Sequence, residues 1–375
     1  MGIEYVEVRN ATREVIGIID TANSILWHSV YNGVGDFEIY IKATPETVSM
    51  LAVGRYITRA DNDEVGIIDK LNITFDLQNG RMIAATGRFA KSLLDRRLIY
   101  KLSGKQNAAT ILSGKVETAV RTVILNNAIN CPFDSKRNIS ILELGALANL
   151  PEVIVDAQGQ AARKQVSYGN LLTYTDDVLY EYGLSAKVIL NNDTKKLQYV
   201  CYKGTNRSVD NADGNEQIIF SQEFDNLTES TYDYDVTQEK NTALIGGEGE
   251  GLARFYSLIT DNSSDLNRKE VWVDASSINK KYKDASDVEH EYTDAEYKAL
   301  LDNQGKQTLS TLIKIESFSG TIDITGGQWL INRDFWVGDI VTVQDNEIGK
   351  YINARITETL ETQDENGYKC EIVYE

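Results

Sequence analysis

The chain has 375 residues, of which 42% are hydrophobic and 25% are charged, so a folded protein with several domains is expected. It contains no run of about 18 apolar residues, which excludes a conventional membrane-spanning helix. The formal net charge is −18, and a chain of this charge has no general means of gripping nucleic acid by its phosphates. Residues 205–305 alone carry 22 acidic and 9 basic side chains. We interpret them as a solvated face, or alternatively as a surface to which passing DNA does not adhere.

The N-terminus predicts a first strand rather than a signal peptide, because residues 1–8 alternate acidic and apolar side chains. The three cysteines, Cys131, Cys201 and Cys370, are odd in number and far apart. This argues against a disulfide framework, and we expect free buried thiols.

Residues 1–103 predict a β-barrel built from short strands, such as 37–41 and 73–77. Asn79-Gly80 lies between two uninterrupted β-type runs, which predicts a type I′ hairpin turn with positive φ at both residues.

Residues 104–215 predict a small α/β domain. Apolar side chains recur at helical spacing within 105–130, and a second helix is expected over 168–182. The β-type runs 184–190 and 197–202 flank a polar turn and predict a hairpin.

Residues 216–261 and 313–375 predict a second barrel, interrupted by an inserted distal arm or domain over 262–312. Within the insertion, Thr293 and Glu296 have the spacing of a capping box, which predicts the start of a short exposed helix.

The two ends of the chain resemble each other. Residues 53–66 and 337–349 share a Val-Gly step, a β-type run and an Asp-Asn pair, allowing one inserted residue, and each is followed by an Asn-Gly turn. The alternative is that this order is generic in β proteins; we favour two related barrels that arose by duplication.

These stretches, together with Gly33-x-Gly35-x-Phe37-Glu38-Ile39 and residues 66–69, make the chain similar to the siphophage tail-associated baseplate hub proteins, in particular the lysin-less type of lactococcal phages. These proteins are related to the hub of contractile-phage baseplates. The resemblance spans nearly the whole chain and implies a mainly β fold with α+β parts: two tail-tube-like barrels, an α/β domain and an inserted distal domain.

The resemblance also implies a function. It implies a non-enzymatic homotrimer in the virion, assembled in the host cytoplasm, that closes the tail tube at the baseplate and opens for genome ejection. The implied partners are the distal tail protein ring, the tape-measure protein and the receptor-binding proteins of the baseplate, with DNA passing through without specific binding.

Motifs that carry chemistry are weak. His28 and His290 lack the spacing of a metal site or a catalytic triad, and His28 is expected in a barrel wall. The glycine-rich run 246–251 lacks the Gly-Lys ending of a phosphate loop; it predicts a turn, or alternatively a hinge. Residues 210–216 fit an Asp-Gly turn better than a calcium loop. We therefore name no catalytic, cofactor-binding or metal-binding residue.

Trp329 and Trp336 lie in one short segment and are the only interface residues we name, because Trp dominates interface energetics; core packing is the alternative. Two other functions stay open. A cell-wall hydrolase is disfavoured because the sequence ends just after the second hairpin, and a saccharide-binding adhesin would need exposed aromatic platforms.

Overall fold

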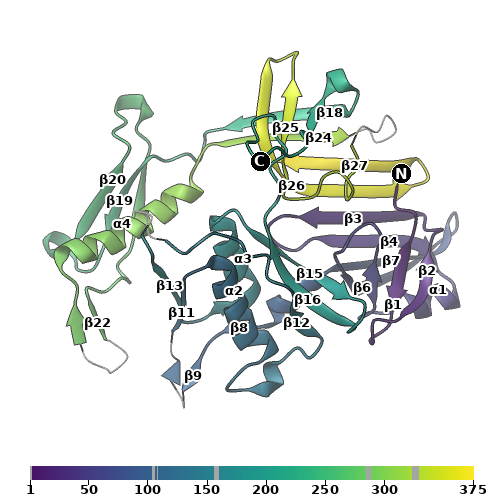
Figure 1. Cartoon of the computed structure of the whole chain (residues 1–375), viewed down its shortest axis with the longest axis horizontal. Helices are drawn as coiled ribbons and strands as arrows, with labels where there is room; N and C mark the ends of the chain where they lie inside the picture. Colours follow the sequence, from purple (N-terminus) through teal and green to yellow (C-terminus); the bar gives the residue numbers. More distant parts are fainter. Residues whose placement is uncertain (1, 104–105, 108, 156–159, 284–288, 323–328) are drawn as a thin grey trace. The chain divides into compact units, whose positions relative to one another are not determined.

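The computed structural model describes residues 2–103, 106–107, 109–155, 160–283, 289–322 and 329–375. It divides into two compact units (Figure 1). The main unit comprises Met1–Ile154, Ala161–Tyr232 and Ser317–Glu375, and the small unit comprises Val155–Gln160 and Asp233–Glu316. The segment expected to form an inserted arm, 262–312, belongs to the small unit, which begins before it.

A 13-stranded sheet runs through the main unit. Its N-terminal strands are β1 (Val6–Arg9), β2 (Val15–Ile19), β3 (Ser24–Val30), β4 (Asp36–Lys42), β5 (Tyr56–Thr58), β6 (Gly66–Asp76) and β7 (Gly80–Phe89), with helix α1 (Pro45–Met50) between β4 and β5. Its C-terminal strands are β17 (Ile219–Ser221), β18 (Leu227–Asp235), β24 (Ile315–Ile322), β25 (Ile340–Asp345), β26 (Lys350–Asp364) and β27 (Gly367–Tyr374). Burial alternates along β3 and β4, which places Trp27 and Phe37 in the core.

The sheet contains the same five-stranded arrangement twice. We call β3-β4-β7-β6-β5 the first module and β18-β24-β27-β26-β25 the second module, each in its order of pairing. The mainly β fold is confirmed, but no closed barrel is found among the described strands. β3, at the edge of the first module, pairs with β26 of the second module instead of closing on its own module, and β18, at the edge of the second module, pairs only with β24 among the described strands.

The two modules share a pattern of backbone hydrogen bonds. The amide of Gly54 donates to Ile68, and Ile68 donates to Arg55; likewise Gly338 donates to Ile356, and Ile356 donates to Asp339. Each distance is 2.8–2.9 Å. The bulges match as well, since pairing shifts between Ile68 and Lys70 in β6 and between Ile356 and Glu358 in β26. The likeness between 53–66 and 337–349 therefore reflects equivalent backbone structure.

The predicted type I′ turn at Asn79-Gly80 is wrong. Asp76 pairs with Gly80 across a three-residue loop, and only Gly80 of the two has positive φ, at 75°. The Asp76 carboxylate accepts hydrogen bonds from the amides of Gln78 and Asn79, and this side-chain cap stabilises a different loop.

The α/β part lies between the modules in sequence. Its main elements are η1 (Ala90–Arg96), α2 (Val116–Ile124), which continues into a π-helical turn at Leu125–Ile129, α3 (Leu171–Glu181), β12 (Leu142–Leu144), β15 (Ser185–Asn191) and β16 (Lys196–Tyr202). Short strands complete it: β8 (Leu98–Ile99), β9 (Leu102–Ser103), β10 (Gln106–Asn107), β11 (Thr110–Ser113), β13 (Arg163–Val166) and β14 (Gly169–Asn170). The expected hairpin is confirmed, because β15 pairs antiparallel with β16 over seven residue pairs.

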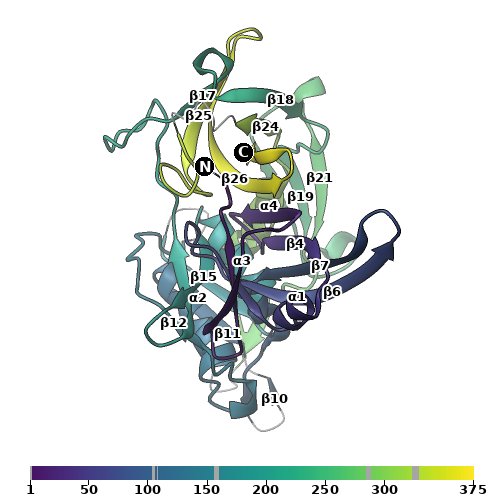
Figure 2. The ribbon, with the colours of Figure 1, turned by 90° about the vertical axis from the view of Figure 1, so that its right-hand side faces the viewer.

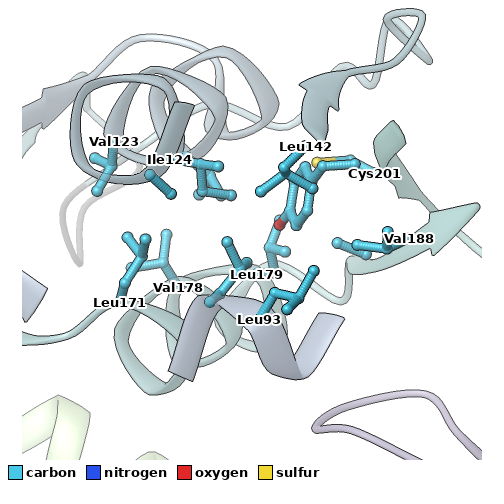
Figure 3. Close-up of a cluster of buried hydrophobic side chains, with 14 of the residues drawn as sticks. Leu93, Val123, Ile124, Leu142, Leu171, Val178, Leu179, Val188 and Cys201 are labelled. Carbon is cyan, nitrogen blue, oxygen red and sulfur yellow. The ribbon is translucent and has the colours of Figure 1, made fainter. Parts of the chain in front are cut away.

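The two predicted helices are present but shorter than expected. The first begins at Val116, not near 105, because β11 and the left-handed Gly114 precede it; Lys105 lies outside the described residues. Val123 and Ile124 of α2 face Leu171 and Val178 of α3 across a buried apolar cluster (Figure 3). The same cluster includes Tyr56 and Ile67, so the α/β part and the first module share a core.

The small unit is a three-stranded sheet covered by a helix. β19 (Thr242–Gly246) pairs antiparallel with β20 (Tyr256–Thr260) and parallel with β21 (Glu270–Asp274), and β22 (Lys281–Lys283) pairs with β23 (Glu289–Glu291). The helix is α4 (Asp294–Thr311), which packs Tyr297 and Leu301 against Ile245. The capping box of Thr293 and Glu296 is confirmed, although the helix has 18 residues and is longer than expected.

Candidate functional site at the junction of the two modules

The two modules meet where β26 pairs with β3. The pairing is antiparallel and extends over seven residue pairs, from Glu358 opposite Val30 to Asp364 opposite Ser24. Figure 1 shows these strands side by side. Segments more than 300 residues apart in sequence are thereby joined into one sheet.

A buried ion pair fastens this junction. Arg59, just after β5, donates two hydrogen bonds of 2.9 Å to the Glu361 carboxylate on β26, one to each oxygen. The Arg59 side chain is fully buried and that of Glu361 is 2% exposed. A bidentate arginine–carboxylate pair is a strong form of this interaction, and it fixes the position of β5 relative to β26.

The surrounding side chains satisfy both charges. Arg59 also pairs with Asp61, and its guanidinium lies 5.3 Å from the centre of the Trp27 ring. Glu361 accepts a hydrogen bond of 2.8 Å from the Tyr368 hydroxyl. Burial opposes the charge of Arg59, but the two carboxylates outweigh it and raise its pKa above the ordinary value.

Two clefts adjoin the ion pair, and a third shares Asn62, Asp63 and Trp336 with the second of them. One of about 310 Å³ is lined partly by Glu361 and Tyr368 at the N-terminal segment, and one of about 470 Å³ includes Arg59. A third of about 280 Å³ lies between the first module and the β15–β16 hairpin. The clefts show where the parts of the main unit meet.

Glu64 lies in the third cleft. Its carboxylate accepts a hydrogen bond of 2.7 Å from the Ser29 hydroxyl, and Lys187 of β15 pairs with the neighbouring Asp63. Desolvation raises the pKa of Glu64 to about 7. This carboxyl group therefore changes its charge near neutral pH.

Tyr31 links the junction to the α/β part. Its hydroxyl donates a hydrogen bond of 2.8 Å to the carbonyl of Gly183, and its ring makes an edge contact with Tyr202. The Arg355 guanidinium lies 4.8 Å from the centre of the same ring. A Cβ at Gly338 would lie 2.4 Å from the Tyr31 ring, so this position of the second repeat requires glycine.

The two tryptophans named from the sequence are placed differently. Trp329 is partly buried and packs against the apolar core of the second module. Trp336 is 41% exposed, lines two of the clefts and has the Arg207 guanidinium 5.6 Å from its ring centre. Gln328, which begins their segment, lies outside the described residues.

The weak chemical motifs are parts of ordinary structure. His28 lies on a strand, β3, which belongs to the open sheet rather than to a closed barrel, with its ring nitrogens 3.2 Å from Glu358 and 3.6 Å from Asp36. Within the run 246–251, Gly246 ends β19 and Gly251 begins a 3-10 turn, and the loop between them is held against α4, where the Tyr297 hydroxyl accepts a hydrogen bond from the amide of Glu248. Over the described part of the chain, no group of three or more His, Cys, Asp or Glu side chains is arranged to hold a metal ion. No helix in that part is long and apolar enough to cross a membrane.

Sequence reasoning missed the ion pair. Glu361 occupies an inward position of a strand that alternates between exposed and buried residues, and Arg59 ends the β-type run of the first repeat. Charged residues at inward positions are the one available signal, because such positions normally hold apolar side chains. The arrangement fastens two halves of a sheet, a mechanical task rather than a chemical one.

Comparison with known proteins identifies the family to which the chain belongs. The chain matches, over residues 5–374, a family described as Siphovirus ReqiPepy6 Gp37-like protein. The chain belongs to this family. No curated protein matches its sequence. The resemblance to a siphovirus tail family is therefore confirmed at the level of the family.

Solved structures show the fold. A tail protein from Neisseria meningitidis MC58 is 14% identical with a TM-score of 0.59, and the match covers 99% of this chain and 95% of that one. The prophage MuSo2 43 kDa tail protein from Shewanella oneidensis is 13% identical, also with a TM-score of 0.59, covering 99% and 98%. The chain thus belongs to a siphovirus tail protein family and has the fold of phage tail proteins.

Proposed function

We propose that the chain is a structural protein of the virion that forms a homotrimeric hub at the tail tip. The hub caps and closes the tail tube at the baseplate and opens when the genome is ejected. The observation that carries this proposal is the pair of repeated modules joined edge to edge through β26 and β3. Three chains present six similar modules, a number that matches a sixfold tube without a mismatch of symmetry.

The buried ion pair suits this role. A hub that transmits a signal from the baseplate must keep its two modules in register, and Arg59 and Glu361 do this inside each chain. The distal tail protein ring and the tape-measure protein are the partners on the tube side, and the baseplate receptor-binding proteins lie outside. No chemical step is part of this function.

The acidic central segment contributes a second property. Residues 205–305 hold 22 acidic and 9 basic side chains, and an acidic surface facing the channel would keep DNA from adhering during passage. A trimer whose lumen is lined with Lys and Arg would contradict this assignment.

Light scattering of the purified chain over a wide range of concentrations tests the proposal. We expect a mass of about three times 41.9 kDa. A strict monomer at every concentration would contradict a hub that assembles by itself. Degradation of purified cell wall, or glycan binding by the chain, would favour the hydrolase or the adhesin instead.

A further inference from the structure

The β6–β7 hairpin carries an exposed apolar row. Leu71, Ile73 and Phe75 lie on one face of β6, and Leu77 follows in the loop. Ile73 is 45% exposed, Phe75 61% and Leu77 96%. Figure 2 shows this hairpin projecting from the first module. An apolar row of this kind on a protein surface marks a site of contact.

The equivalent row of residues in the second module is buried. With Ile68 equivalent to Ile356, the residues equivalent to Leu71, Ile73 and Phe75 are Thr359, Glu361 and Gln363. Thr359 and Glu361 are buried, and Gln363 is partly buried. They are covered because β26 has the first module on its other side.

The outer edge of β26 is paired, whereas the outer edge of β6 is open. From Glu358 to Asp364, β26 pairs with β27 on one side and β3 on the other. The equivalent stretch of β6, Lys70–Asp76, pairs only with β7 among the described residues. Its outer N–H and C=O groups form an open edge, which is a template for another strand.

The matching free edge lies at the far end of the sheet. β3 of the first module corresponds to β18 of the second, and β18 has β24 as its single neighbour among the described strands. Six strands separate β18 from β6 in the pairing order of the sheet, and within one chain these two edges are not paired with each other.

We propose that residues 70–76 of β6 pair antiparallel with β18 of a second copy of this chain, as β26 pairs with β3 within one chain. The pairing covers the apolar row of the hairpin. It rests on the proposed function, because three such contacts alternate with the three internal junctions and close a ring of six modules.

Cysteine cross-linking of the full chain tests the pairing directly. Thr74→Cys is combined in turn with Thr228→Cys, Ser230→Cys and Tyr232→Cys. The combination that forms a cross-link shows which residue of β18 lies opposite Thr74. We expect at least one pair to give covalent dimers and trimers on mild oxidation, because bridged Cα atoms must lie within about 7 Å. Thr74→Cys with Tyr168→Cys, at an exposed position on the α/β part, is the control.

The outcomes separate this inference from the proposed function. A trimeric mass without a cross-link from any of the three pairs would overturn the strand pairing and leave the hub in place. Cross-linked open chains of other sizes would support the pairing and overturn the trimer. A monomer that gives no cross-link would overturn both.

A second variant tests the apolar row without covalent chemistry. Ile73→Ser combined with Phe75→Ser should weaken self-association about tenfold or more, because apolar area is no longer buried. These side chains are exposed in the single chain, so folding should be unaffected. Tyr168→Ser, which removes an aromatic ring that is 80% exposed, should leave the association unchanged. Binding of the wild-type chain to anionic vesicles through Phe75, without any cross-link, would show that the row serves a membrane instead.

Discussion

Arg59 and Glu361 form a buried ion pair across 302 positions of the chain, with both hydrogen bonds at 2.9 Å. Removing one partner leaves an uncompensated charge in the sheet. Arg59→Met or Glu361→Leu should therefore lower the free energy of unfolding by about 3–5 kcal/mol. The double variant should lose less than either single variant, because it leaves no buried charge.

The midpoint of urea unfolding, followed by tryptophan fluorescence, measures these losses. Arg88→Met is the control, since Arg88 and Asp69 form an exposed pair, and such pairs contribute about 0–1 kcal/mol. Additive losses in the double variant would show that the two residues do not act together.

Glu64 should make stability depend on pH. Its pKa is raised from 4.5 to about 7 in the folded chain, so the folded state binds this proton more tightly than the unfolded state does. Its contribution to stability is therefore largest below pH 4.5 and is lost as the pH rises to about 7. Glu64→Gln removes this dependence.

Thermal unfolding of Glu64→Gln and wild type at pH 5, 6, 7 and 8 checks the sign. The difference in midpoint should shift in favour of the variant as the pH rises. The exposed Glu365→Gln variant corrects for general effects of charge. A difference that stays constant from pH 5 to pH 8 would exclude a raised pKa at Glu64.

The two equivalent glycines should respond unequally to alanine. Gly54 and Gly338 have φ of 84° and 102°, so alanine costs about 1–2 kcal/mol of backbone strain at either position. Only at Gly338 would the new Cβ meet the Tyr31 ring, whereas nothing lies within 4 Å at Gly54. Urea midpoints should therefore show a larger loss for Gly338→Ala, and equal losses would mean that the Tyr31 ring moves away freely.

The two tryptophans should separate folding from assembly. Trp329→Ala should lower the free energy of unfolding by roughly 2–3 kcal/mol, because the ring packs against the second core. Trp336→Ala should leave stability nearly unchanged and weaken trimer formation, if its half-exposed ring lies at a subunit contact. Unfolding midpoints and mass as a function of concentration distinguish the two effects, and a Trp336→Ala chain that assembles normally would remove this residue from the interface.

Local sequence patterns determined many elements of the fold. The hairpin of β15 and β16 and the capping box at Thr293 and Glu296 depend on neighbouring residues, whose propensities act at short range. The likeness of 53–66 to 337–349 was also visible, because repeats keep their glycines where φ is positive. That likeness, together with Gly33-x-Gly35-x-Phe37-Glu38-Ile39 and residues 66–69, carried the resemblance to a siphovirus tail family.

Only the tertiary structure decided how the repeats meet. No local pattern states that β26 pairs with β3, because strand pairing over 300 positions depends on edge geometry and on the burial of both faces. The buried Arg59–Glu361 pair depends on that strand pairing, because each buried charge is strongly destabilising without the opposite charge beside it. The turn at Gly80 was mispredicted for a similar reason: the side chain of Asp76 selects the loop, and the dipeptide alone does not.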